Sequence, residues 1–150
     1  MKSILLLMGP NLNMLGEREP EIYGSETIEE HVKQAERVAN EFGYKLEHFQ
    51  SNNEGELVDQ IQNARGKHMG IIINPGAFTH YGWSIHDALA AFDGVVIEMH
   101  LSNPNQRESW RHTSVVAPVA NGSIIGFGIH GYELSIRAFH KIIENDDQRT

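Results

Sequence analysis

Strand-sized apolar segments alternate with amphipathic helical patterns along this chain, and this alternation restricts its fold more than any other feature. Strands are expected at 3–8, 45–50, 70–73, 95–100 and 123–127. Apolar residues three or four apart predict helices over 27–43, 57–64, 85–92 and 132–144. Chains that alternate strands and helices in this way form a parallel sheet with helices on both faces.

The 150 residues are enough for one domain with a full core. We expect a single flavodoxin-like domain over 1–150, an α/β three-layer sandwich whose five-stranded parallel sheet has the order 2-1-3-4-5. The polar tail 145–150 is expected to fray. Ligands of such sheets bind beyond the carboxyl ends of the strands, which places a site near Asn11, 74–77 and 100–102.

Composition excludes several classes of function. The net charge of -8 argues against a nucleic-acid partner, and the absence of Cys excludes disulfides and thiolate zinc sites. The chain has neither an apolar run long enough to span a membrane nor a signal-peptide pattern, so we expect a cytoplasmic location without a membrane partner.

Three polar side chains alternate at the end of the fourth predicted strand. Glu98, His100 and Ser102 are two residues apart, so an extended chain would place them on one face. An imidazole beside a carboxylate is typical of acid–base chemistry, although a solvated or hydrogen-bonded histidine at a strand end explains the same pattern.

The long segment 9–24 after the first strand is rich in Gly, Pro and Asn and is interpreted as a functional loop, whose length supports a lid over the strand ends. A guanidinium such as Arg18 favours the ionised form of a phenol such as Tyr23, which could then act as a base. The alternative is a tyrosine that anchors the loop by packing. Arg107 and Arg111 are four apart and could face a carboxylate or polyol together, or only contact solvent.

The stretch after the third strand, Asn74-Pro-Gly76-Ala77, places a carboxamide and free backbone N–H groups where the sheet ends. These groups suit an oxygen-rich anion.

Other motifs are weaker. The G-x-G-x-x-G at 126–131 resembles a dinucleotide fingerprint, but no second strand follows to carry the ribose-binding acid, so turn glycines are favoured. The first loop lacks phosphate-binding hydroxyls, and Asn74 replaces the aspartate of a phosphoacceptor. His80, Glu98 and His100 could converge on a metal, but the histidine spacings lack a helical ligand pair, so no metal is expected. A binding module without turnover and a metal hydrolase remain alternatives.

Taken together, seven stretches resemble the type II 3-dehydroquinate dehydratases. They are GPNLNMLG (9–16), REPEIYG (18–24), FQSNNEGELVD (49–59), IIINPGAFTH (71–80), VIEMHLSN (96–103), RESWR (107–111) and IIGFGIHGY (124–132). The resemblance implies a hydro-lyase that converts 3-dehydroquinate to 3-dehydroshikimate through an enolate by anti elimination. It implies no cofactor, a homododecamer built from four trimers, and a place in the shikimate pathway (chorismate and aromatic amino acid biosynthesis) or in quinate breakdown.

The resemblance also implies roles for individual residues. Tyr23 would be the proton acceptor, His100 the proton donor, Arg18 the stabiliser of the tyrosinate and the transition state, Asn11 the enolate ligand through a water, and Glu98 the residue that orients His100. The substrate would be bound by Asn74, Gly76, Ala77, His80, Leu101, Ser102, Arg111 and, from a neighbouring subunit, Asp87. None of the lysines lies in the matched site stretches, which disfavours a Schiff-base route.

Two departures from the family pattern concern the subunit contact. The family usually has T-H-T-S or T-H-Y-S after the third strand and Arg-Asp in the next helix. Here Tyr81-Gly82-Trp83 follows His80, and His86 precedes Asp87. Loss of that arginine is expected to affect the trimer contact or the affinity, and Trp83 could compensate by packing.

Overall fold

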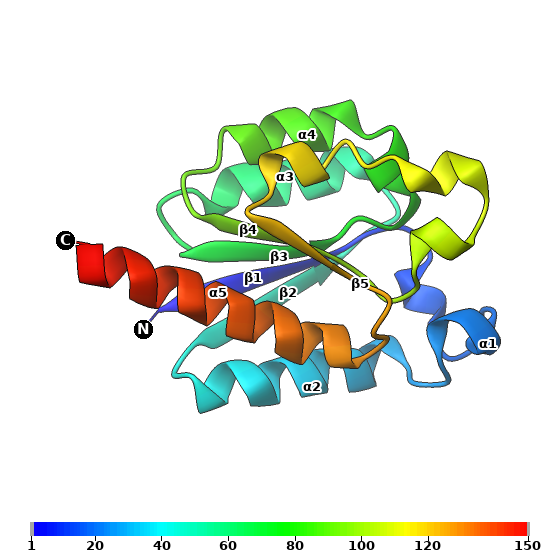
Figure 1. Ribbon diagram of the computed structural model, residues 1–150, viewed down its shortest axis with the longest axis horizontal. Helices are drawn as coiled ribbons and strands as arrows, with labels where there is room; N and C mark the ends of the chain where they lie inside the picture. The colour runs from blue at the N-terminus through cyan, green and yellow to red at the C-terminus, as the bar shows by residue number, and fades with distance from the viewer. Residues whose placement is uncertain (1, 150) are drawn as a thin grey trace.

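The computed structural model describes residues 2–149, and its centre is a five-stranded sheet in which every strand pair is parallel. The strands are β1 (Ser3–Met8), β2 (Lys45–Gln50), β3 (Gly70–Asn74), β4 (Val95–His100) and β5 (Gly122–Ile125). Their order, β2-β1-β3-β4-β5, confirms the expected flavodoxin-like arrangement. Figure 1 shows the sheet between two helical layers.

The longer helices form the two outer layers. They are α2 (Ile28–Glu41), α3 (Glu54–Ala64), α4 (Trp83–Ala90) and α5 (His130–Arg149). Helices α3 and α4 contact each other on one face of the sheet, and α2 and α5 contact each other on the other (Figure 1). Within residues 2–149, no helix is both long and apolar enough to cross a membrane.

Strand β1 shows why this sequence requires helices on both faces. Ile4, Leu6 and Met8 pack into the core under α2 and α5, whereas Leu5 and Leu7 pack into the core under α3 and α4. Burial of an aliphatic side chain of this size contributes about 1.5–3 kcal/mol. An uninterrupted apolar strand is therefore stable only at the centre of the sandwich.

Polar caps begin two of these helices. The Thr27 hydroxyl accepts a hydrogen bond from the Glu30 backbone N–H at 3.3 Å, as the capping pattern predicted. The Asn53 side chain accepts from the Gly55 N–H at 2.9 Å and so caps α3. The start of each helix is thus fixed by local sequence.

Several predicted boundaries differ from the structure. The segment 9–24 is not a continuous loop, because it contains the 3-10 turn η1 (Leu12–Met14) and the short helix α1 (Pro20–Tyr23). The fifth strand ends at Ile125 rather than 127, since Gly126 has a φ of 92° and leaves the extended conformation. Helix α5 continues past 144 to Arg149, because residues 145–149 contain no Gly or Pro that would end it earlier.

Candidate active site

A cleft lies at the carboxyl ends of β1, β3 and β4, the edge of the sheet where the sequence predicted a site. The space between its walls, part of it open to solvent, is about 560 Å³. Its lining includes Asn11, Arg18, Tyr23, Asn74, Gly76, Ala77, His80, His100, Leu101, Ser102, Arg107 and Arg111. Most side chains singled out from the sequence are therefore gathered in one place.

The floor of the cleft depends on close contact between the ends of β1 and β3. Gly9 donates its N–H to the Asn74 carbonyl at 2.8 Å, and a Cβ at Gly9 would lie 2.4 Å from the Pro75 carbonyl oxygen. Only glycine allows this approach. Asn11 follows with a φ of 68°, a left-handed conformation that Asn tolerates better than most residues.

Asn74 lies at the end of β3 and is 3 % exposed. Its side-chain oxygen accepts a hydrogen bond from the Gly76 N–H at 3.2 Å. The expectation of a free backbone donor at Gly76 was therefore wrong, because the carboxamide closes a local turn with it. The amide nitrogen of Asn74 remains the group that this turn leaves for a ligand.

Tyr23 ends the short helix α1 and is half-buried at the cleft wall. The Arg107 guanidinium donates to the Tyr23 hydroxyl at 2.8 Å and to the Ser102 hydroxyl at 3.2 Å. Arg18 instead lies over the phenol ring, with its guanidinium carbon 4.6 Å from the ring centroid. The sequence predicted a guanidinium beside this phenol, but Arg107 rather than Arg18 contacts the oxygen.

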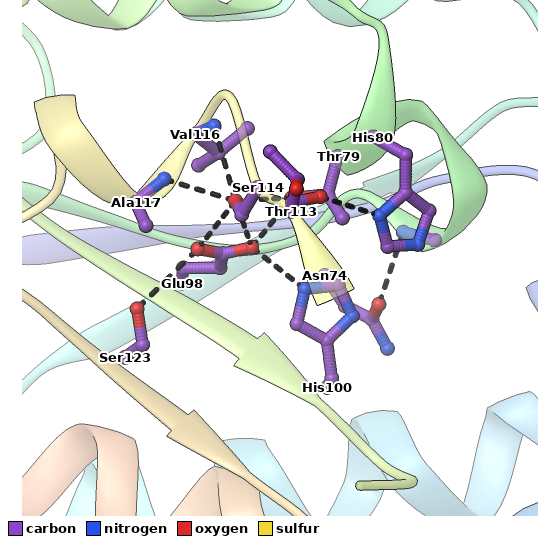
Figure 2. A network of polar contacts seen from close by, with 11 residues as sticks. Asn74, Thr79, His80, Glu98, His100, Thr113, Ser114, Val116, Ala117 and Ser123 are labelled. Carbon is purple, nitrogen blue, oxygen red and sulfur yellow. Dashed lines mark hydrogen bonds and ion pairs between the residues drawn. The ribbon is translucent and has the colours of Figure 1, made fainter. Parts of the chain in front are cut away.

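His100 and Glu98 form the second polar pair of the cleft, and Figure 2 shows their surroundings. The Nε2 atom of His100 lies 2.7 Å from Glu98 Oε2. The carboxylate of Glu98 is 2 % exposed and also accepts hydrogen bonds from Thr79 at 2.5 Å, Ser114 at 2.8 Å and Ser123 at 3.3 Å. The structure thus places Glu98 and His100 beside each other, as the sequence predicted.

Burial alone would raise the pKa of Glu98, but the bonds from His100, Thr79 and Ser114 hold that pKa below its ordinary value. An ionised carboxylate accepts only, so the Nε2 atom of His100 must be the protonated nitrogen of this contact. The opposite ring nitrogen, Nδ1, is then the one that can exchange a proton with a ligand in the cleft.

His80 and Arg111 line the same cleft as Tyr23 and come from two short 3-10 helices. His80 ends η2 (Gly76–His80), and its Nδ1 donates to the Thr113 carbonyl at 2.7 Å. Burial lowers the pKa of His80. Arg111 lies in η4 (Ser109–His112), where it donates to Glu108 at 2.6 Å and stacks on Trp110.

Three placements differ from the sequence-based picture. Ser102 lies beyond β4, which ends at His100, so it does not extend the alternating face of that strand. Arg107 follows η3 (Pro104–Gln106) and Arg111 belongs to η4, so they are not neighbours on one helix. Both nevertheless reach the cleft.

Asp87 lies on α4, is exposed, and is outside the lining of this cleft. Asp87 therefore does not line the cleft of its own subunit, and its role in the cleft of a neighbouring subunit stays a prediction. Among residues 2–149, no three His, Asp or Glu side chains are grouped so as to hold a metal ion.

The sequence did not place four residues beside the two polar pairs that they contact in the structure, namely Arg107, Thr79, Ser114 and Ser123. The spacing of Arg107 from Arg111 indicated a shared ligand but not a contact with Tyr23. Thr79 precedes His80 in a matched stretch. Ser114 and Ser123 carried no local signal, because only the fold brings them to Glu98.

The glycines of the G-x-G-x-x-G pattern lie in the turn between β5 and α5. Gly126 has a φ of 92° and Gly128 a φ of 56°. These values favour glycine and agree with the turn interpretation of the motif.

Comparison with known proteins points to one family. A family model described as "Dehydroquinase class II" matches residues 2–140. The 3-dehydroquinate dehydratase of Halalkalibacterium halodurans is 51% identical over 138 residues, which cover 92% of this chain and 95% of that protein. The 3-dehydroquinate dehydratase of Cereibacter sphaeroides is 53% identical over 135 residues, 90% of this chain and 92% of that protein.

A solved structure agrees with these sequence relatives. The crystal structure of a type II dehydroquinase from Butyrivibrio crossotus superposes with a TM-score of 0.90 at 46% identity, and the match covers 92% of this chain and 97% of that one.

Proposed function

This chain belongs to the class II dehydroquinase family and is a hydro-lyase with 3-dehydroquinate dehydratase activity, and we propose that it works without a cofactor, through Tyr23 as base and His100 as acid. One observation carries the proposal. A phenol bound by a guanidinium and an imidazole bound by a carboxylate line the same cleft. Loss of water from a β-hydroxy ketone needs one group of each kind.

Tyr23, as tyrosinate, removes a proton from C2 of the substrate, next to the ketone at C3. The Arg107 guanidinium donates to the phenol oxygen at 2.8 Å and the Arg18 guanidinium lies over the ring, so two positive charges lie beside the group that takes up the proton. Both guanidinium groups therefore support the base, and Arg107 does so by direct hydrogen bonding.

The electron pair from the broken C–H bond forms an enolate whose negative charge is on the C3 oxygen. Asn11, at the edge of the cleft, stabilises that oxygen through a bound water. Its left-handed backbone positions the side chain directly after β1.

His100 then protonates the C1 hydroxyl, which departs as water while the enolate collapses to the conjugated enone. The ionised Glu98 accepts from Nε2 of the ring and so fixes which nitrogen faces the substrate. Base and acid act from opposite sides of the substrate, as an anti elimination requires.

The remaining cleft residues bind the substrate. Asn74, Ser102 and the backbone of Leu101 hold the carboxylate, with Gly76 and Ala77 shaping the turn beside it. His80 and Arg111 bind the ring hydroxyls, and the Arg111 guanidinium donates hydrogen bonds that the oxygens of a polyol or carboxylate accept.

We further propose a homododecamer of four trimers in which Asp87 enters the cleft of a neighbouring subunit. Its exposed position on α4, outside its own cleft, supports this assignment. We also propose a cytoplasmic location. The enzyme would serve either aromatic biosynthesis or quinate breakdown, since both pathways use this reaction.

Turnover of 3-dehydroquinate, followed by the ultraviolet absorbance of the enone product, tests the proposed route. We expect activity that survives borohydride, which traps imines, and a metal chelator. Saturable binding without product would replace the proposal with a binding module. Inactivation by chelator would indicate a metal-dependent reaction instead.

A further inference from the structure

Ser114 lies outside every stretch that resembles the family motifs, yet its hydroxyl occupies the centre of the network around Glu98 (Figure 2). Its Oγ is 2.8 Å from Glu98 Oε2, 3.0 Å from Glu98 Oε1, and 2.8 Å from the Thr79 hydroxyl. Contact with both oxygens of a buried carboxylate makes Ser114 well placed to fix its orientation.

The direction of these bonds follows from two backbone donors. The N–H groups of Val116 and Ala117 donate to Ser114 Oγ at 3.1 Å and 3.0 Å. They use the lone pairs of the hydroxyl, so its single proton must point elsewhere, either to Glu98 directly or to Thr79, which donates to Glu98 at 2.5 Å. Either arrangement forms a chain of donors that ends on the carboxylate, and such chains strengthen one another.

The 113–117 segment also holds other parts of the site. The Thr113 carbonyl accepts from His80 at 2.7 Å, and the Val115 N–H donates to the Thr79 carbonyl at 2.7 Å. The Val115 carbonyl also binds His86 Nδ1 at 2.6 Å. One short segment therefore connects the support of His100 to that of His80, which lines the same cleft.

We propose that Ser114 is a positioning residue for the acid half of the reaction, and that it acts on His100 through the orientation and charge of Glu98. This inference rests on the function proposed above. Ser114 does not line the principal cleft and touches no group that would contact the substrate there. Its effect is therefore expected on the chemical step rather than on substrate binding.

The ionisable groups around Glu98 set the expected pH response. Among the described residues they are His100 on the same strand, His80, Arg111 and His112. The hydrogen bond from Ser114 is one of the contacts that lower the pKa of Glu98. Without it the carboxylate becomes protonated at a higher pH, and the contact that holds His100 is lost there.

The test compares kcat and KM of the full-length wild type, Ser114→Ala and Ser114→Thr from about pH 3.5, below the ordinary pKa of a glutamate, to pH 9. We expect Ser114→Ala to lower kcat about tenfold, with KM changed less than about twofold, because a hydrogen bond to a charged group is lost. The acid limb of kcat should move up by about one pH unit. Ser114→Thr keeps the hydroxyl and should restore both values to near wild type.

Ser84→Ala is the matched control, because the Ser84 hydroxyl donates to Glu54 at 2.5 Å in an exposed pair outside the cleft lining. It should leave the pH profile unchanged. If Ser114→Ala loses thermal stability but keeps the wild-type kcat and acid limb, Ser114 only caps the following turn, and the proposal is overturned. Should Ser114→Ala not fold, Ser114→Cys replaces it, with a weaker donor of similar size.

A separate readout distinguishes this proposal from the proposed function. Nitrogen-15 NMR of His100 without substrate should show the Nε2-protonated tautomer in the wild type and a mixture in Ser114→Ala. If the wild type has no turnover, the proposed function is refuted, but the His100 tautomer still tests whether Ser114 positions the ring. An unchanged tautomer in Ser114→Ala would refute the role of Ser114 even in an active enzyme.

Discussion

Tyr23 and His100 line the same cleft, but the protein holds them in different ways. His100 ends β4, whose preceding residues are all buried, and its ring is bound to a carboxylate with three further donors. Tyr23 ends a four-residue helix that contains no buried residue and begins after Glu19, whose φ is 40°. The acid is thus part of the sheet, whereas the base is carried on a short surface helix without a fully buried residue.

This difference separates the functions of the two regions. A segment with little buried surface can open at a small cost in free energy, so we expect α1 to admit the substrate and then bring Tyr23 to it. The Glu98–His100 pair needs no such movement. Its geometry and charge are set when the sheet folds, which makes the acid half sensitive to residues far along the chain.

The largest effect is expected from Tyr23→Phe, which removes the base and leaves the acid half intact. General-base catalysis contributes about 10²–10⁴-fold, so kcat for dehydration should fall about 10³-fold or more. Stability should change little, because α1 contributes no buried residue to the core. Steady-state kinetics and thermal unfolding measure the two quantities.

Tyr44→Phe is the matched control for this substitution. Tyr44 is 3 % exposed and hydrogen-bonds to His140 at 2.6 Å, away from the cleft lining. It should lower the free energy of unfolding by about 1 kcal/mol and leave turnover unchanged. Near-normal turnover in Tyr23→Phe would remove the assignment of the base.

A smaller loss is expected from Arg107→Met, which sharpens the account of how the base is supported. The lost hydrogen bond to the phenol oxygen is worth about 2 kcal/mol, or about thirtyfold in kcat. Arg65→Met, at an exposed position just after α3, is the control and should have no effect. If only Arg18→Met lowers kcat, direct contact with the phenol oxygen is not what activates Tyr23.

The smallest effect concerns the pH dependence of stability, which should separate the two halves. The pKa of Glu98 is lowered in the folded protein, so Glu98 stabilises the fold above its ordinary value of 4.5, and this contribution is lost as the pH falls through the lowered value. Urea unfolding of Glu98→Gln should therefore show a shallower loss of stability below about pH 4.5 than the wild type.

Glu29→Gln, on the exposed surface of α2, is the control for this measurement and should retain the wild-type slope. A Glu98→Gln slope equal to that of the wild type would show that the acid pair is not coupled to folding.

The periodic parts of the fold could be predicted because local sequence determines them. The uninterrupted apolar run of β1 required helices on both faces, and Thr27 identified the start of α2. The segment containing α1 could not be predicted, since four residues give no measurable period and Tyr23 is positioned by contacts with Arg18 and Arg107.

The site shows the same limit. The rule that ligands bind beyond the carboxyl ends of parallel strands is enough to place Asn11, Asn74 and His100 together, and all three line the cleft. Ser114 and Ser123 could not be found in this way. They lie 16 and 25 residues from Glu98 in the sequence and meet it only because β4 and β5 pair and the 113–117 segment folds back to contact Glu98.

Deuterium exchange at C2 of 3-dehydroquinate tests the division into a base half and an acid half most directly. The substrate is incubated in D₂O with His100→Ala or Tyr23→Phe, and the recovered substrate and any product are analysed by NMR. We predict that His100→Ala incorporates deuterium at C2 while forming little 3-dehydroshikimate, because Tyr23 still removes and returns the proton. Tyr23→Phe should do neither, and exchange by Tyr23→Phe at the rate of His100→Ala would contradict the account.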